Sequence, residues 1–216
     1  MKKKRGFFIT IEGIDGCGKT LMSELIADRL KVEGYSLILT REPGGSKLGQ
    51  RLREVLLDGE LGTIGREAEA LLFAADRAQH VADVIRPALN AGQIVVCDRY
   101  ADSTIAYQGG GRSMDKDFLQ RLNDFSTASL QPDLTLLLQI TLEQSLGRRS
   151  GRPDRMEQED RLFFNAVASA YQELAEAYPQ RITLIDASRT PEEVFADVQA
   201  NVARLLNNYE LKRQDK

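Results

Sequence analysis

Short apolar runs alternate along the chain with longer amphipathic stretches. Five runs are apolar at most positions, as strands buried on both faces of a sheet are, and they span residues 7–12, 36–40, 94–98, 134–140 and 182–186. Elsewhere apolar residues recur at three- and four-residue spacing, which predicts helices over residues 19–33, 48–57, 67–91, 116–128, 142–149, 157–178 and 191–208. Strands alternating with helices predict an α/β fold whose parallel sheet carries helices on both faces.

The first predicted strand leads into a glycine-rich loop. Residues 13–20 read Gly-Ile-Asp-Gly-Cys-Gly-Lys-Thr and match the pattern G-x-x-x-x-G-K-[ST] at every fixed position. A strand before the loop and a helix after it favour a phosphate-binding P-loop over a chance glycine turn. In such a loop backbone N–H groups cradle phosphates, the lysine reaches the β- and γ-phosphates, and the Ser/Thr hydroxyl binds Mg²⁺. The predicted ATP phosphate-binding residues are therefore Gly13, Asp15, Gly16, Cys17, Gly18, Lys19 and Thr20.

A P-loop occurs in GTPases, motors, transporters and small kinases, so other features have to choose among them. The guanine-binding pattern N-K-x-D is absent, and 216 residues leave no room for motor or transport domains. Asp98 and Arg99 follow a predicted strand, where the carboxylate can hold Mg²⁺ and the guanidinium can face a phosphate. A surface ion pair at a strand end is the alternative interpretation.

Composition and charge narrow the function classes. Apolar residues make up 42% of the chain and charged residues 28%, with a net charge of −3, so a general nucleic-acid binder is disfavoured. The two cysteines, Cys17 and Cys97, form neither a disulfide framework nor a zinc spacing. No apolar run is long enough to span a membrane, and the one at 7–11 is too short for a signal peptide. We therefore expect one cytoplasmic domain.

Residues 148–160 are crowded with both signs of charge. Arg148, Arg149, Arg152 and Arg155 lie there among aspartates and glutamates, and Arg161 follows directly. The usual meaning of such a run is a solvated helix face. Beside a P-loop, however, arginines on a closing lid stabilise the charge that develops during phosphoryl transfer. We predict a lid over about residues 148–160.

Several motifs in their order and spacing resemble those of one family. They are the P-loop, Arg-Glu-Pro-Gly-Gly at 41–45, Phe-Ala-Ala-Asp-Arg at 73–77, Asp-Arg-Tyr at 98–100 with the segment 103–112, Pro-Asp-Leu-Thr at 132–135 and Asp-Arg-Met-Glu at 154–157. From about residue 7 to residue 203 the chain resembles the thymidylate kinases. The loop interior carries no arginine whereas the lid carries several, so it is similar to the bacterial, lid-arginine type.

The resemblance implies a P-loop NTPase fold in three layers, with five parallel strands in the order 2-3-1-4-5 and one nucleoside monophosphate kinase domain over residues 1–216. It implies an enzyme that phosphorylates dTMP to dTDP with ATP and Mg²⁺ and so supplies dTTP for DNA replication. ATP and dTMP are the implied partners, with no nucleic acid and no membrane. The implied assembly is a homodimer, for which the helix at 67–91 offers an isologous face.

The resemblance also assigns roles to single residues. Phe73 stacks on thymine, Arg77 bonds a base carbonyl, and Thr104 and Gln108 complete the base edge. Tyr107 lies under the deoxyribose, where a 2′-hydroxyl would clash. The implied dTMP-binding residues are Asp15, Glu42, Pro43, Arg53, Phe73, Arg77, Arg99, Ser103, Thr104, Tyr107 and Gln108. The implied catalytic residues are Asp15, Lys19, Arg99, Arg149 and Arg152, and the metal ligands are Thr20 and Asp98.

Taken alone, several of these residues have plainer interpretations. Phe73 lies in an apolar stretch and on that ground is more often a core residue, while Arg53 and Arg77 read as helix-surface arginines. His80 is expected to be a packing or surface residue rather than a catalyst, because phosphoryl transfer by positioning needs no histidine base.

The chain departs from the family pattern at one strand. Residues 138–140 read Leu-Gln-Ile where the family has Leu-Asp followed by Val or Ile, so Asp98 is the better metal candidate. The lid is short near residues 150–153, which leaves the choice among Arg149, Arg152 and Arg155 open. Two other functions remain: a kinase for another nucleotide such as dUMP, and a nucleotide-binding regulator without transfer.

Overall fold

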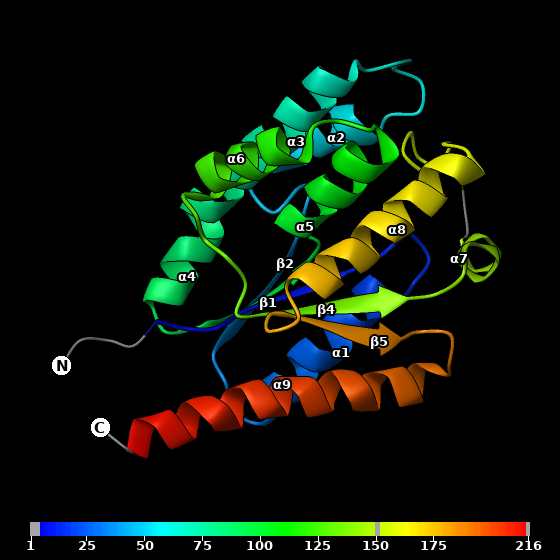
Figure 1. Ribbon diagram of the computed structural model, residues 1–216. Helices are drawn as coiled ribbons and strands as arrows, with labels where there is room; N and C mark the ends of the chain where they lie inside the picture. Colours follow the sequence, from blue (N-terminus) through cyan, green and yellow to red (C-terminus); the bar gives the residue numbers. More distant parts are fainter. Residues whose placement is uncertain (1–4, 150–151, 215–216) are drawn as a thin grey trace.

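The computed structural model of the chain describes residues 5–149 and 152–214, and is built around one parallel sheet (Figure 1). The sheet order is β2-β3-β1-β4-β5, and all four neighbouring pairs are parallel. The strands are β1 (Phe8–Glu12), β2 (Leu37–Arg41), β3 (Ile94–Asp98), β4 (Leu134–Gln139) and β5 (Ile182–Asp186). The predicted α/β class, the helix-flanked sheet and its 2-3-1-4-5 order are confirmed.

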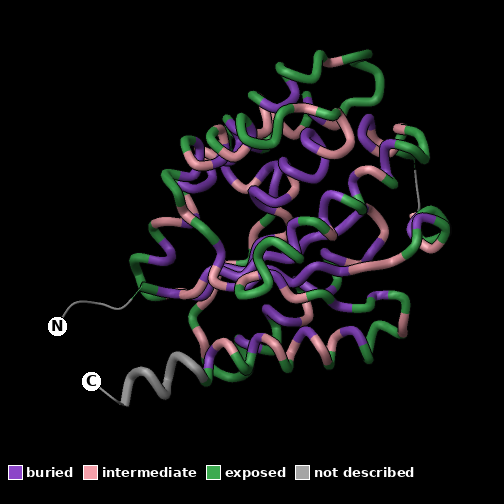
Figure 2. Tube along the Cα trace, viewed as in Figure 1, coloured by how far each residue is buried: buried purple, intermediate pink, exposed green. Residues whose placement is uncertain are grey.

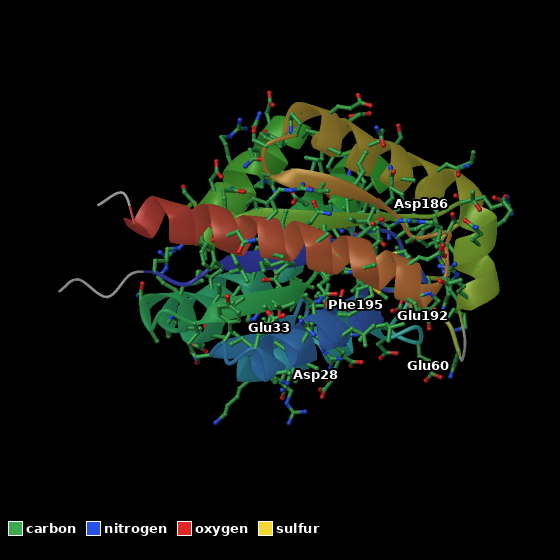
Figure 3. The ribbon with its side chains drawn as sticks, turned by 90° about the horizontal axis from the view of Figure 1, so that it is seen from below. Asp28, Glu33, Glu60, Asp186, Glu192 and Phe195 are labelled. Carbon is green, nitrogen blue, oxygen red and sulfur yellow. The ribbon has the colours of Figure 1, made fainter. Side chains whose placement is uncertain are left out.

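Helices cover both faces of this sheet. The segments assigned helical are α1 (Lys19–Val32), α2 (Lys47–Leu57), α3 (Arg66–His80), η1 (Val81–Ile85), α4 (Arg86–Asn90), α5 (Ala101–Thr104), η2 (Ile105–Gly111), α6 (Lys116–Thr127), α7 (Leu142–Arg148), α8 (Arg161–Ala177) and α9 (Pro191–Gln214). On one face α1 and α9 lie side by side, and Phe195 of α9 packs against the core they share (Figure 3). On the other face α4, α5, η2 and α8 pack over the strands (Figure 1).

The alternation of side chains along each strand explains why both faces are apolar. Ile9 and Ile11 of β1 join the core under α1 and α9, whereas Phe8 joins the core on the opposite face. All five residues of β1 are buried, so the strand presents no polar edge to water. Figure 2 shows this buried interior, with exposed positions on the outer helix surfaces. Among the described residues, no helix is long and apolar enough to cross a membrane.

The helix predicted over residues 67–91 is helical throughout but is not one regular α-helix. It starts at Arg66 and changes to π-helical geometry over Val81–Ile85. The backbone N–H of Arg86 bonds the carbonyl of Val81, five residues back, immediately before Pro87. Proline has no N–H to donate, so a wider turn before it fits the local backbone.

The segment 101–111 was not among the predicted helices, and the structure shows it helical as α5 and η2. Three consecutive glycines at its end disfavour a helix by local propensity. Gly110 has a packing role instead: a Cβ there would lie 2.7 Å from the carbonyl oxygen of Ala166 and 2.7 Å from Cβ of Ala170 on α8. The absent side chain lets α8 approach η2 closely.

The helix predicted over 157–178 begins later, at Arg161. Asp160 caps it by accepting a 2.8 Å hydrogen bond from the N–H of Phe163. Before the cap, Asp154 and Glu157 exchange side-chain-to-backbone bonds of 2.9 and 3.1 Å, which hold a turn rather than a helix. Of the predicted lid, residues 150–151 lie outside the described residues.

Candidate active site

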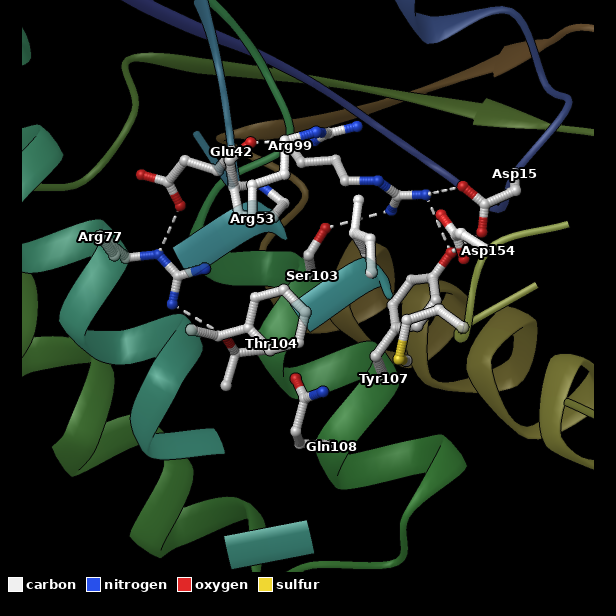
Figure 4. Close-up of a pocket in the computed structure, with 14 residues that line it drawn as sticks. Asp15, Glu42, Arg53, Arg77, Arg99, Ser103, Thr104, Tyr107, Gln108 and Asp154 are labelled. Carbon is white, nitrogen blue, oxygen red and sulfur yellow. Dashed lines mark hydrogen bonds and ion pairs between the residues drawn. The ribbon is translucent and has the colours of Figure 1, made fainter. Parts of the chain in front are cut away.

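Two cavities open at the carboxyl ends of the strands, where ligands of such sheets bind. One runs along the loop between β1 and α1 and reaches Lys19 and Thr20. The other lies between α2, α3 and η2 (Figure 4). Both cavities are lined by Asp15, Glu42, Arg53 and Arg99. A donor phosphate in the first cavity and an acceptor in the second would therefore meet at these four side chains.

The P-loop has the geometry that its glycines predict. Gly13 adopts a φ of 137°, and a Cβ there would lie 2.5 Å from the carbonyl oxygen of Leu138. At Gly16, with a φ of 78°, a Cβ would lie 2.6 Å from the carbonyl oxygen of Ser145. Larger residues would be strained and would clash at both positions. Lys19 is buried, and its Nζ donates to the carbonyl of Ile14 at 2.9 Å.

Thr20 and Asp98 meet at the start of α1, although they lie on different elements. The Thr20 hydroxyl donates to Asp98 Oδ2 at 2.6 Å. Carboxylate and hydroxyl oxygens suit Mg²⁺, which typically takes one or two protein ligands and completes its shell with phosphates and water. Within the described part of the chain no group of three or more His, Cys, Asp or Glu could hold a metal by itself. The donor set therefore fits a Mg²⁺ ion that arrives with a nucleotide.

Asp15, Arg99 and Tyr107 form a closed triangle at the junction of the two cavities (Figure 4). Arg99 Nη2 donates to Asp15 Oδ1 at 2.5 Å and to the Tyr107 hydroxyl at 2.9 Å, and that hydroxyl donates to Asp15 Oδ2 at 2.9 Å. Burial alone would raise the pKa of the Asp15 carboxyl, but Arg99 and Lys19 hold it well below its ordinary value. Asp15 is thus a fixed negative charge beside two cations.

Arg77 anchors one wall of the acceptor cavity. It is buried, and its guanidinium donates to Glu42 Oε2 at 2.8 Å, Thr104 Oγ1 at 2.8 Å and Asn123 Oδ1 at 2.9 Å. Burial alone would lower the pKa of Arg77, and Glu42 raises it above its ordinary value, so the cation is kept. The sequence analysis did not identify Asn123. It is a polar residue on the buried face of the amphipathic helix α6, and that position could have indicated its role.

The other predicted acceptor residues line the same cavity. Phe73 is half-buried there, and none of the three apolar clusters formed by the described residues includes it. Arg53 Nη1 donates to the carbonyl of Pro43 at 2.9 Å, and Ser103 donates to Glu12 Oε2 at 2.7 Å. The cavity is completed by Leu57, Asp154 and Met156, to which the sequence assigned no role in acceptor binding, although Asp154 and Met156 belong to the motif at 154–157.

The lid arginines occupy three different environments. Arg149 stacks over the Phe164 ring at 4.3 Å and donates to Ser145 Oγ at 3.1 Å, and that hydroxyl bonds the P-loop carbonyl of Asp15 at 2.6 Å. Arg155 is buried against Glu69. Arg152 forms an exposed ion pair with Glu60 at 3.1 Å. Neither Arg149 nor Arg152 lines either of the two cavities, whereas Arg148 lines the P-loop cavity. The structure therefore does not bring Arg152 to the other predicted catalytic residues.

Two further residues are accounted for by packing. Gln139, at the position of the family's aspartate, donates to Gln172 Oε1 of α8 at 2.7 Å. His80 is fully buried between Glu42 Oε1, 2.9 Å from its Nδ1, and Thr40 Oγ1, 2.7 Å from its Nε2. His80 thus supports the loop after β2, as the packing interpretation predicts.

Comparison with known proteins agrees with this geometry. A family model described as thymidylate kinase matches residues 11–198. The thymidylate kinase of Desulfovibrio desulfuricans is 46% identical over 208 residues, covering 92% of this chain and 96% of that protein. The enzyme of a Synechococcus strain is 52% identical over 189 residues, covering 88% and 90%. A crystal structure of thymidylate kinase from Ehrlichia chaffeensis superposes with a TM-score of 0.77 at 33% identity, covering 92% of this chain and 99% of that one. By sequence and by structure, this chain belongs to the thymidylate kinase family.

Proposed function

We propose that the protein transfers the γ-phosphate of ATP to dTMP, giving dTDP and ADP as a step toward dTTP. The observation that carries this proposal is the pair of cavities that share Asp15 and Arg99. One has the P-loop lining that triphosphates need, and the other has an aromatic ring and amide, hydroxyl and guanidinium groups suited to a flat base.

In this proposal the catalytic groups act mainly by position and charge. An oxygen of the acceptor phosphate attacks the γ-phosphorus, and the bond from that phosphorus to the bridging oxygen of ADP breaks. Lys19 and Arg99 border the transferred group and neutralise charge that spreads over its oxygens. Arg149 adds a further cation from the lid. The lid spans residues 148–160 and belongs to the same single domain. Asp15 holds Arg99 in place and reaches toward the 3′-hydroxyl of the acceptor.

Mg²⁺ is the expected cofactor, with Thr20 and Asp98 as its protein ligands. When bound, the ion would neutralise phosphate charge and hold the donor oxygens in register. The distance of 2.6 Å between Thr20 Oγ1 and Asp98 Oδ2 supports this assignment, since two oxygens this close together can bind the same ion.

We further infer a homodimer in the cytoplasm. Helices α3 and α6 pack against each other, and both leave large apolar side chains in water. Leu71 of α3 is 56% exposed, and Phe118 and Phe125 of α6 are 42% and 86% exposed. We call this surface the α3–α6 face. A second copy of the chain would cover it in an isologous contact.

The test is an ADP-release assay with ATP, Mg²⁺ and a panel of nucleoside monophosphates. We expect turnover with dTMP well above that with the others. Lys19→Ala should keep the fold, measured by circular dichroism and thermal unfolding, and should leave less than about one per cent of the turnover, because such charge contacts are worth several kcal/mol in a dry site. Preference for dUMP would identify a different kinase, and ATP binding without ADP release would identify a regulator.

A further inference from the structure

Glu69 of α3 is a fully buried carboxylate that has no part in the mechanism above. It lies one helical turn before Phe73, and four hydrogen bonds end on it. Gln108 Nε2 donates to Oε1 at 2.9 Å, and Arg112 donates to Oε1 and Oε2 at 3.1 Å each. Arg155, from the lid, donates to Oε2 at 2.6 Å. The carboxylate therefore links Gln108 of the acceptor cavity to Arg155 of the proposed lid.

The contact with Glu69 fixes which end of the Gln108 amide faces the pocket. An ionised carboxylate only accepts hydrogen bonds, so the amide must turn its NH₂ group toward Glu69. Gln108 lines the acceptor cavity, and its side chain points into that cavity beside Thr104 (Figure 4). Among the described residues no hydrogen bond engages its Oε1. The group left for a ligand is a carbonyl oxygen, which is an acceptor.

Glu69 stays ionised despite its burial. Burial by itself would raise the pKa of this carboxyl, but hydrogen bonds from Arg112 and Gln108 outweigh that effect and lower it. At neutral pH the group is acceptor-only, and the orientation of the Gln108 amide is settled.

Thr104 supplies the complementary group on the same edge. Its Oγ1 accepts from Arg77 at 2.8 Å, and in the described part of the chain no hydrogen bond uses its proton, which can therefore be donated to a ligand. The pocket therefore presents a donor and an acceptor together. A pyrimidine imide has the matching pattern, a carbonyl beside a ring N–H. Cytosine has the opposite pattern, an amino group beside an unprotonated ring nitrogen.

We propose that Glu69 is a positioning residue for base selection: by holding the NH₂ of Gln108, it makes the pocket accept an imide base and reject cytosine. This inference rests on the proposed function and deepens it, since it names the class of base and the group that selects it. Glu69 touches no substrate in this role and acts through Gln108.

The substitution Glu69→Gln should remove the selection. Oε2 has two arginine donors and Oε1 has one, Arg112 Nε, so the oxygen of the new amide is expected at the Oε2 position and its NH₂ group at the Oε1 position, facing Gln108. There it donates to the Gln108 carbonyl, and the Gln108 amide turns its own NH₂ toward the pocket. The pocket then presents two donors, which suits the ring nitrogen of cytosine and opposes the imide N–H.

The readout is the ratio of dissociation constants for dCMP and dTMP, measured by calorimetry with intact protein. We expect this ratio to fall by about tenfold to a hundredfold in Glu69→Gln, the usual weight of a hydrogen bond to a charged or oriented group. Affinity for dUMP should fall with that for dTMP, because uracil shares the imide. In the double variant Glu69→Gln, Gln108→Glu the side chain at 108 can only accept, so the preference for dTMP should return.

A matched control separates selection from stability. Asp102 is also a buried carboxylate, and it accepts from Arg181 at 2.6 and 2.9 Å. Asp102→Asn should lower stability without changing the dCMP-to-dTMP ratio. An unchanged ratio in Glu69→Gln, or an equal loss of affinity for all three nucleotides, would overturn the proposal.

Nucleotide binding and phosphate transfer are measured in separate experiments, so the proposed function and the proposed role of Glu69 can be refuted independently. Tight dTMP binding by the wild type without ADP release refutes the proposed function, and the ratio of dissociation constants still decides the role of Glu69. Absence of dTMP binding by the wild type refutes both.

Discussion

Three carboxylates near the site differ in charge because their neighbours differ. Asp15 lies between Arg99 and Lys19, which depress its pKa against the effect of burial. Glu69 has hydrogen bonds from Arg112, Gln108 and Arg155. For Glu12, burial and the nearby Asp102 raise the pKa to about 7, although Arg99 and two hydroxyl groups act in the opposite direction. The same functional group, a carboxyl, thus supplies two fixed charges and one group that titrates near neutrality.

Tyr107 should enforce the preference for deoxyribose. A ring against C2′ leaves a 2′-hydroxyl without a partner, which costs about 1–3 kcal/mol, so dTMP should exceed ribothymidine monophosphate in kcat/KM by roughly tenfold to a hundredfold. Tyr107→Ala should lose most of this ratio. Tyr107→Phe should keep it but lower kcat, since its hydroxyl bonds Asp15 and Arg99 at 2.9 Å each. Equal use of both sugars by the wild type would show that Tyr107 is no sugar gate.

Glu12 should make stability depend on pH. Burial raises its pKa to about 7 in the native state, above the ordinary range of a glutamate, so the native state favours the protonated form. The resulting stabilisation is complete below the unfolded pKa and is lost as pH rises through about 7, on the order of 3 kcal/mol in total. Urea unfolding from pH 5 to 8.5 should show this decline in the wild type.

The variant Glu12→Gln provides the comparison for that decline. Glutamine keeps an acceptor for the N–H of Tyr100 and can donate to Ser103 or Tyr171, whose hydroxyls both contact Glu12. Its unfolding free energy should decline less over the same range. Asp76, whose pKa burial and Glu42 raise to about 6, contributes equally to both proteins. Parallel pH profiles for the two proteins would contradict the assignment.

Among the elements, α7 and α8 bound the segment that we propose as a lid. The capping box at Thr141 starts α7, and Asp160 starts α8, so the polar turns between them are bounded by two well-capped helices. Arg149 lies at the C-cap of α7 and is linked through Ser145 to the P-loop carbonyl of Asp15. Its Nε is buried and has no partner among the described residues.

The lid arginines should therefore differ in effect. Arg149→Ala is expected to lower kcat at least about tenfold with a smaller change in KM for dTMP, because its charge counts most when charge develops on the transferred group. Arg152→Ala should have a smaller effect, since Arg152 pairs with Glu60 in water unless the lid closes. Steady-state kinetics of both variants measure this. A larger loss in Arg152→Ala would mean that closure brings Arg152, and not Arg149, to the phosphates.

At the scale of the whole molecule, the helices on the two sides of the sheet differ in the side chains that they expose to water. The face under α1 and α9 is closed by those two helices, and acidic residues such as Asp28 and Glu33 lie on the outer side of α1 (Figure 3). On the other side, the α3–α6 face leaves three large apolar residues exposed. An apolar surface of this kind is typical of an interface.

Association should depend on the α3–α6 face. Phe125→Glu and Leu71→Glu are expected to convert a dimer into monomers in size-exclusion chromatography with light scattering, because a buried charge without a partner opposes association. Val32→Glu is the control, since Val32 is 82% exposed on α1, across the sheet. A dimer that survives both substitutions, or a wild-type monomer, would contradict the proposed interface.

The sequence by itself determined the sheet, the P-loop and most of the residues around the acceptor cavity. These features can be predicted because they depend on local properties: the apolar runs of the strands, the glycine pattern and the spacing of short motifs. Hydrogen bonding and φ preferences act over a few residues, so such patterns predict the local structure directly. The sequence missed the helical segment 101–111, because three glycines there disfavour a helix by local propensity, while their use is close contact with α8.

Only the tertiary structure decided how residues far apart in the chain share a charge or a hydrogen bond. Gln108 and Arg112, at the end of η2, and Arg155, before α8, meet Glu69 of α3, and no spacing in the sequence shows that these three segments converge. The same holds for Arg152, which the motif places in the lid and the fold places against Glu60. Electrostatic and hydrogen-bonding partners are set by distances in space, and those distances exist only after the elements pack.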